Sequence, residues 1–141
     1  MEHLATDTRI VLLLAGLMFL WALVLGQIKY RQILASALGQ AHVYTDIAHR
    51  AALMYSFALV LIAAFVELSA WSTAVDLAAA GVLTFYFVAA VGSYMVHGLR
   101  QDTENQLAHP PGWMRVFMTS LVIGEIGGFV VLLAGFVAAL R

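Results

Sequence analysis

Four long apolar stretches alternate with polar segments along the chain. They cover residues 10–27, 49–70, 72–96 and 116–140. Each is long enough to cross a bilayer, because the hydrocarbon core of roughly 30 Å takes about 20 helical residues. The pattern therefore predicts an all-α integral membrane protein, a four-helix bundle in one domain over residues 1–141, with lipid around it.

The second and third stretches predict an antiparallel hairpin, because only a very short turn around residues 70–73 separates them. If Trp71 is the tip, His49 lies 22 residues before it and Tyr94 lies 23 residues after it. Each helical residue rises about 1.5 Å, so equal distances from the tip mean equal depths in the membrane. We therefore expect an imidazole and a phenol side by side near one membrane face.

Two longer polar loops are predicted, over residues 28–48 and 97–115. The middle of the first, RQILASALGQA, could form a short interfacial helix, and Pro110 and Pro111 interrupt any helix in the second. Five of the seven Lys and Arg residues flank these loops, so the positive-inside rule places the loops in the cytoplasm. We expect a protein of a bacterial inner membrane with both termini outside.

Composition excludes several classes of protein. The 141 residues are 63% hydrophobic and 11% charged, which is too apolar for a soluble domain of this size. The net charge of −1 argues against a nucleic-acid partner. The absence of cysteine rules out disulfides, thiolate ligands and iron–sulfur clusters. No nucleotide-binding, zinc-protease or serine-hydrolase motif is present, and the first apolar stretch is interpreted as a retained helix.

Acidic residues within or near the spans are candidates for function, because a charge inside a membrane is costly. Glu125 lies near mid-membrane in the fourth stretch. It could relay protons, bind a cation or anchor a polar partner, or it could be a protonated carboxyl hydrogen-bonded between helices. Glu67 and Asp76 lie near the hairpin tip, where we expect them to be interfacial and solvated.

Small residues at helical spacing predict close packing of helices. Gly124 and Gly128 form a GxxxG motif around Glu125, and Ala22 and Gly26 are similarly spaced in the first stretch. Such faces let two helix backbones approach closely, within one chain or between chains. They carry no information about chemistry.

Histidine and tyrosine side chains gather at one end of the hairpin. His49 and His97 stand at the same membrane edge, and neutral imidazole is a common ligand of metals and haem. Tyr94 and His97 share a helical face. Tyr55 lies about 9 Å deeper than His49, opposite Phe87. Aromatic residues that face each other across a hairpin are explained by packing alone. They would also suit a flat macrocycle or an aromatic substrate.

Two segments of the hairpin stand out: AHRAALMY, which contains His49, and GSYMV, which contains Tyr94. Together they resemble the styrene oxide isomerase family, whose members are small four-helix membrane proteins. The interval between this His and this Tyr agrees with the family pattern without a gap, as does Gly92. The resemblance covers residues 46–98, and the length and helix number of the chain also agree.

The resemblance implies a haem b enzyme that is a homotrimer, with haem at the subunit interfaces. His49 would be the axial ligand of the iron, and Tyr94 would hold the oxygen of a hydrophobic aryl epoxide. The ferric iron would act as a Lewis acid in a Meinwald rearrangement, which isomerises the epoxide to an aldehyde without net redox change. From its charge and position, we expect Arg50 to pair with a haem propionate.

One position departs from the family pattern. The family has a substrate-contacting Asn six residues after the ligand His, where this chain has Tyr55. A phenol there would reshape the substrate pocket. Two further hypotheses remain open: a haem electron carrier with His49 and His97 as axial ligands, and a small transporter or structural subunit that uses Glu125.

Overall fold

The computed structural model describes residues 4–108 and 110–141. This part of the chain forms the four α-helices α1 (Thr6–Ala35), α2 (Val43–Glu67), α3 (Thr73–Arg100) and α4 (Gly112–Ala139). Each is long and apolar enough to cross a membrane. The predicted all-α bundle of four spans is therefore confirmed, and the chain is an integral membrane protein.

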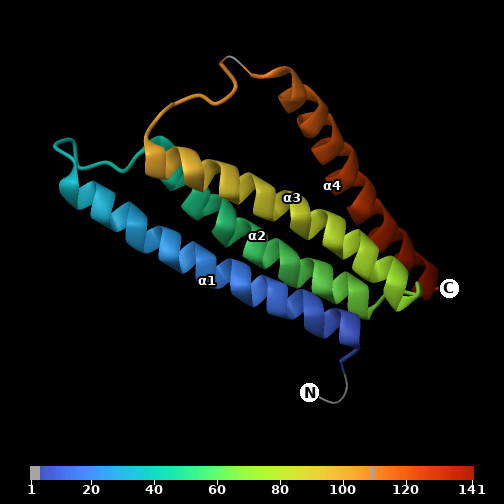
Figure 1. The fold of residues 1–141 in the computed structure, drawn as a ribbon. Coiled ribbons are helices and arrows are strands. Elements are labelled where there is room, and N and C mark those ends of the chain that lie inside the picture. The colour runs from blue at the N-terminus through green and yellow to red at the C-terminus, as the bar shows by residue number, and fades with distance from the viewer. Residues whose placement is uncertain (1–3, 109) are drawn as a thin grey trace.

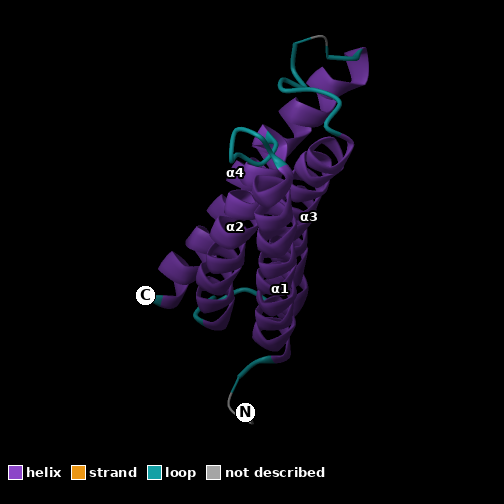
Figure 2. Ribbon diagram, turned by 90° about the vertical axis from the view of Figure 1, so that its left-hand side faces the viewer, coloured by secondary structure: helices purple, strands orange, loops and turns teal. Residues whose placement is uncertain are grey.

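Helices α1, α2 and α3 lie side by side, and each runs antiparallel to the next (Figure 1). Helix α4 leans across this layer: it is close to the hairpin tip at its C-terminal end and diverges from α3 towards its start (Figures 1 and 2). The start of α1 and the end of α4 lie at one end of the bundle. The two longer loops lie at the other end, together, as predicted.

Both longer loops are shorter than predicted. Helix α1 continues to Ala35 and α2 begins at Val43, so no interfacial helix forms between them, and Gly39 turns the chain with a positive φ of 64°. The side chain of Gln32 holds the extended end of α1, because its amide donates to the Gly98 carbonyl at 3.1 Å and its oxygen accepts the His42 N–H at 3.0 Å. The helices therefore extend past the apolar stretches that mark them in the sequence.

The register of the α2–α3 hairpin follows the prediction. The rings of Tyr55 and Phe87 stack with centroids 4.1 Å apart, and each residue lies 16 positions from Trp71. Nearer the loops, Gly98 packs on Thr45, and a Cβ at Gly98 would lie 2.6 Å from the Thr45 nitrogen. These residues lie 27 and 26 positions from Trp71. Equal distances from the tip therefore do mean equal depth along this hairpin.

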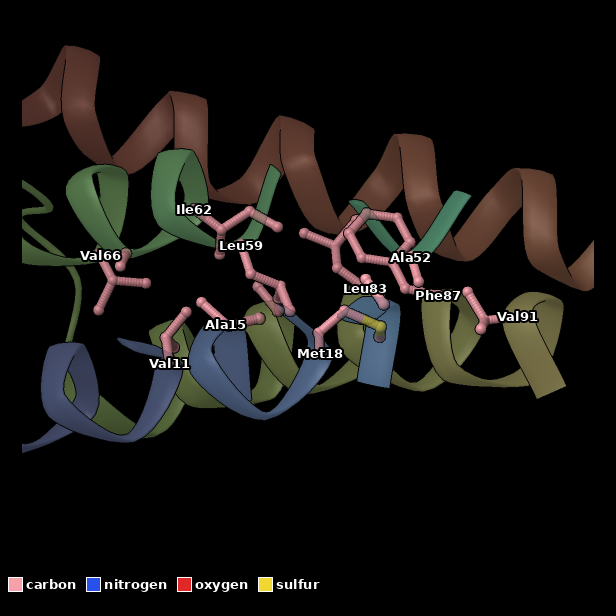
Figure 3. Packing of buried hydrophobic residues seen from close by; sticks show 14 of the residues in the cluster. Val11, Ala15, Met18, Ala52, Leu59, Ile62, Val66, Leu83, Phe87 and Val91 are labelled. Atoms are coloured by element: carbon pink, nitrogen blue, oxygen red, sulfur yellow. The ribbon is translucent and has the colours of Figure 1, made fainter. Parts of the chain in front are cut away.

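The hydrophobic core lies between α1, α2 and α3, whereas α4 buries little of its surface (Figure 3). The two buried residues of α4 are Leu132 and Gly135. The predicted GxxxG face packs on α3, since a Cβ at Gly128 would lie 3.2 Å from the Ala79 carbonyl oxygen. Ten labelled core residues in Figure 3 come from the first three helices: Val11, Ala15, Met18, Ala52, Leu59, Ile62, Val66, Leu83, Phe87 and Val91.

The hairpin tip anchors the end of α4. The Ala70 N–H donates to the Gly135 carbonyl at 3.1 Å, and the Trp71 indole N–H donates to the Val131 carbonyl at 2.9 Å. The expectation that Asp76 is solvated was wrong: it is 1% exposed. Asp76 lies in the first turn of α3, which meets the first turn of α1 at this end of the bundle, and the positive end of a helix dipole favours a carboxyl there.

Candidate functional site

His49 points from α2 towards the backbone of α1. Its Nδ1 lies 2.9 Å from the Ala22 carbonyl oxygen. A carbonyl oxygen can only accept, so we assign the proton to Nδ1, which leaves the lone pair on Nε2. Gly26 makes room for the ring, because a Cβ there would lie 2.9 Å from His49 Cε1. Ala22 and Gly26 therefore form the surface of α1 on which the His49 imidazole packs, which we call the His49 seat.

A pair of cations flanks His49 on the loop side. Arg50 is exposed, and its Nη2 lies 2.9 Å from Asp46 Oδ2. Lys29 of α1 pairs with the other oxygen of the same carboxylate. Two positive groups share one negative group here, so the polar end of the α1–α2 face carries net positive charge.

An apolar groove of about 320 Å³ lies on the α1–α2 face, deeper in the bundle than His49. The rings of Phe19 and Phe57 meet edge to face beside it, with centroids 6.3 Å apart, and Phe57 is 67% exposed. From the loop end inwards, this face thus presents cations, an imidazole and an aromatic groove. The groove is lined by Leu12, Ala15, Gly16, Phe19, Ser56, Phe57 and Val60.

Tyr94 lies at the level of His49 but on a different side of α2. Its ring stacks on Tyr44, with centroids 5.9 Å apart and an angle of 15° between the planes. Tyr44 and His49 are five residues apart, which is a rotation of about 140° around a helix. The structure therefore brings the predicted imidazole and phenol to one depth, but the expectation that they lie side by side was wrong, because His49 faces α1 and Tyr94 faces Tyr44.

Sequence reasoning missed Tyr44, because this residue fell within the predicted first loop. It is buried at 6% exposure, and its hydroxyl accepts the backbone N–H of Gln106 at 2.7 Å. Its ring also tilts against His97 at 5.6 Å. A signal was available: Tyr44 lies 27 residues before Trp71 and His97 lies 26 after it, so the hairpin register puts them level.

A cavity opens where α4 diverges from α3. It measures about 340 Å³ and has Tyr94 in its wall. The Ser93 hydroxyl donates to Gln106 Oε1 at 2.9 Å at its polar edge, and Trp113 and Phe117 of α4 form an aromatic wall. The Tyr94 hydroxyl has no hydrogen-bond partner within residues 4–108 and 110–141. The cavity therefore combines apolar walls with an available donor, as small-molecule sites do.

Tyr55 and Glu125 belong to this α3–α4 side of the molecule. Tyr55 is stacked on Phe87, and its phenol interacts electrostatically with Glu125 and Tyr94. Glu125 Oε1 is buried, and no hydrogen-bond partner for it lies in the described part of the chain. Tyr55 and Glu125, which the sequence left unrelated, therefore lie within range of an electrostatic interaction.

His97 is held away from His49. Its Nδ1 lies 2.7 Å from Asp102 Oδ1, and this hydrogen bond holds the pKa of the Asp102 carboxyl below its usual range. His97 therefore faces Asp102 and Tyr44, whereas His49 faces α1. Over the described ranges, no three His, Asp or Glu side chains converge on a point where they could hold a metal ion.

A scan of protein-family models finds no match to this chain, and comparisons with curated proteins and with solved structures find none either.

Proposed function

We propose that this chain is a membrane haem b protein with epoxide isomerase activity, in which His49 is the axial ligand. The observation that carries the proposal is the hydrogen bond from His49 Nδ1 to the Ala22 carbonyl. Haem-ligating and metal-ligating histidines usually donate their second nitrogen to a carbonyl or carboxylate, which fixes the tautomer and orients the ring. Here this arrangement leaves Nε2 with the lone pair that iron needs.

The surroundings of His49 fit the two ends of haem. Haem carries two propionates at one edge and an apolar macrocycle. Arg50 and Lys29 supply positive charge at the loop end, where propionates would lie next to polar headgroups. The Phe19 and Phe57 rings offer apolar contact in the groove, deeper in the bundle. The ordering of charge, ligand and groove therefore supports haem on the α1–α2 face.

The substrate side of the proposal lies on the α3–α4 face. The cavity beside Tyr94 has a size usual for small-molecule pockets, and its aromatic wall suits an aryl group. Because His49 and Tyr94 belong to different faces of one chain, a second copy is needed to bring an α1–α2 face against an α3–α4 face. A homotrimer with haem between subunits would do this, and the large exposed surface of Phe57 would then be covered.

The residues of the chain have distinct tasks in the proposed isomerisation. When bound, haem would supply a ferric Lewis acid to the epoxide oxygen. The benzylic C–O bond breaks, a hydride moves from the neighbouring carbon to the benzylic carbon, and a carbonyl forms, with no net redox change. Tyr94 donates a hydrogen bond to the oxygen as negative charge develops there. The apolar walls exclude water, which would otherwise give a diol.

Tyr55 places a phenol at the position where the styrene oxide isomerase pattern has the amide of an Asn. It is packed flat on Phe87, so its ring is fixed. Tyr55 lies outside the lining of the cavity beside Tyr94, so we do not expect it to narrow that cavity.

The test combines spectroscopy with product analysis. Protein purified from cells with ample haem supply should show a Soret band, and incubation with styrene oxide should yield phenylacetaldehyde. A Soret band without product would retain the haem assignment and contradict the isomerase activity. A colourless preparation would contradict both.

Glu125 supports a second candidate function. A buried carboxyl oxygen at mid-membrane, with no hydrogen-bond partner among the described residues, is the group that a proton-coupled transporter requires. On that candidate, the Glu125→Gln variant would lose transport and the protein would carry no chromophore. On the haem candidate, the same variant should keep its Soret band.

A further inference from the structure

Tyr44 lies where α2, α3 and the loop of residues 101–108 meet. Its ring stacks almost parallel to Tyr94 and tilts against His97, and it also stacks on His42 at 6.2 Å. Its hydroxyl accepts the Gln106 backbone N–H at 2.7 Å. The residue is 6% exposed, so these contacts are made within a closed environment where a hydrogen bond is strong.

We propose that Tyr44 is a positioning residue, which sets the plane of the Tyr94 ring and fixes the loop of residues 101–108 against the α3–α4 cavity. The two tasks belong to different parts of the side chain. The ring makes the aromatic contact with Tyr94, and the hydroxyl makes the contact with the loop. The importance of Tyr94 rests on the proposed function, but the two contacts of Tyr44 can be tested without it.

The loop contact reaches the cavity through one residue. Gln106 receives the Tyr44 contact at its backbone and the Ser93 hydroxyl at its side chain, and it lines the cavity together with Tyr94. Tyr44 therefore contacts Tyr94 through its ring and the backbone of Gln106 through its hydroxyl. A phenol whose ring is held by a stacked neighbour is better oriented than one whose ring turns freely, and orientation is a large part of catalysis.

The two parts of the side chain separate in two variants. Tyr44→Phe keeps the ring and removes the hydroxyl, whereas Tyr44→Leu removes both. Tyr30 on α1 is 55% exposed and supplies the matched controls Tyr30→Phe and Tyr30→Leu. All five proteins are compared at full length in the same micelles, after circular dichroism has shown equal helix content.

Fluorine NMR reports the ring contact. With 3-fluorotyrosine placed at position 94, the stacked Tyr44 ring shifts the fluorine resonance through its ring current. Tyr44→Phe should retain this resonance, and Tyr44→Leu should move and broaden it. A resonance that is the same in Tyr44→Leu as in the Tyr30 controls would overturn the proposed contact with Tyr94.

Hydrogen exchange reports the loop contact. Loss of the hydroxyl should speed exchange in the peptide of residues 101–108 by about fivefold in both Tyr44 variants and leave it unchanged in the Tyr30 variants. Equal exchange in all five proteins would overturn the loop assignment. Neither readout needs haem or substrate, so an inactive protein with these shifts would contradict the proposed function and leave the Tyr44 contacts standing.

If the protein isomerises styrene oxide, turnover gives a third readout. Tyr44→Leu should lower kcat by about tenfold or more, because a phenol that is not held loses part of its effect on the barrier. Restoration of most of the rate by Tyr44→Phe is expected for a positioning ring. A kcat unchanged in Tyr44→Leu would overturn the positioning role.

Discussion

The two sides of α2 hold their polar residues by different means. On the side facing α1, the backbone carbonyl of Ala22 and the absent side chain of Gly26 hold His49. On the side facing α3, stacked rings and a loop amide hold Tyr94 and Tyr44. A backbone acceptor cannot be deleted by substitution, so the contacts of His49 are best disturbed by adding an atom at Gly26. The contacts of Tyr94 and Tyr44 depend on side chains and are disturbed by removing those side chains.

The largest effect on the Tyr94 side should come from Tyr94→Phe. Removal of one donor to a developing oxyanion commonly costs about a hundredfold or more in kcat. We expect a loss of this size in styrene oxide isomerisation, with the Soret band unchanged because His49 lies on the other side of α2. A turnover equal to that of the unsubstituted protein would show that Tyr94 has no part in the chemistry.

On the His49 side, Gly26→Ala should weaken haem binding by about 10- to 100-fold, as changes next to a metal ligand do. The added Cβ would lie 2.9 Å from His49 Cε1, so the ring must shift relative to the Ala22 carbonyl. Haem titration of the apo-protein measures the effect. Gly81→Ala is the control, since a Cβ there meets no atom within 4 Å. Equal haem affinity in both variants would contradict the claim that Gly26 helps to hold His49 in position to bind haem.

The Gly98→Ala variant should disturb the packing of α3 on α2. A Cβ at Gly98 would lie 2.6 Å from the Thr45 nitrogen, a backbone atom that cannot move alone. We expect a loss of about 1–3 kcal/mol in the free energy of unfolding, as overpacking produces. Thermal unfolding in micelles, compared with Gly81→Ala, checks this. Equal melting temperatures would show that the hairpin accommodates the methyl group.

The smallest effect should come from His97→Ala. His97 is engaged by Asp102 and Tyr44, not by the His49 seat, so we expect the Soret band to keep its position and intensity. A haem electron carrier with two axial histidines would instead change from six- to five-coordinate. A shift of the Soret band in this variant would therefore favour the electron carrier over the isomerase.

The depth of residues was predictable from the sequence, because the rise of a helix is fixed and the hairpin turn is short. Trp71 as the tip placed Tyr55 opposite Phe87, and the stacked rings confirm this. The direction in which each side chain points was not predictable. In a membrane all faces of a helix are apolar, so the hydrophobic pattern carries little information about rotation around the helix axis.

Helix ends were also predicted poorly, for a related reason. Hydropathy marks the segment inside the hydrocarbon, whereas hydrogen bonding decides where a helix stops. Gln32 and Tyr44 lay in a predicted loop and belong to α1 and α2. Both make contacts that join the helix ends to the rest of the bundle. Side-chain contacts between distant segments have no signature in a single sequence.

The measurement that most directly tests the central claim is the absorption spectrum of the His49→Gly variant, purified with haem supply, before and after addition of imidazole. If Nε2 of His49 ligates the iron, the variant should lack the Soret band of the unsubstituted protein and should regain it when free imidazole enters the vacated His49 seat. A band that survives the substitution unchanged, or an unsubstituted protein without one, would contradict the account.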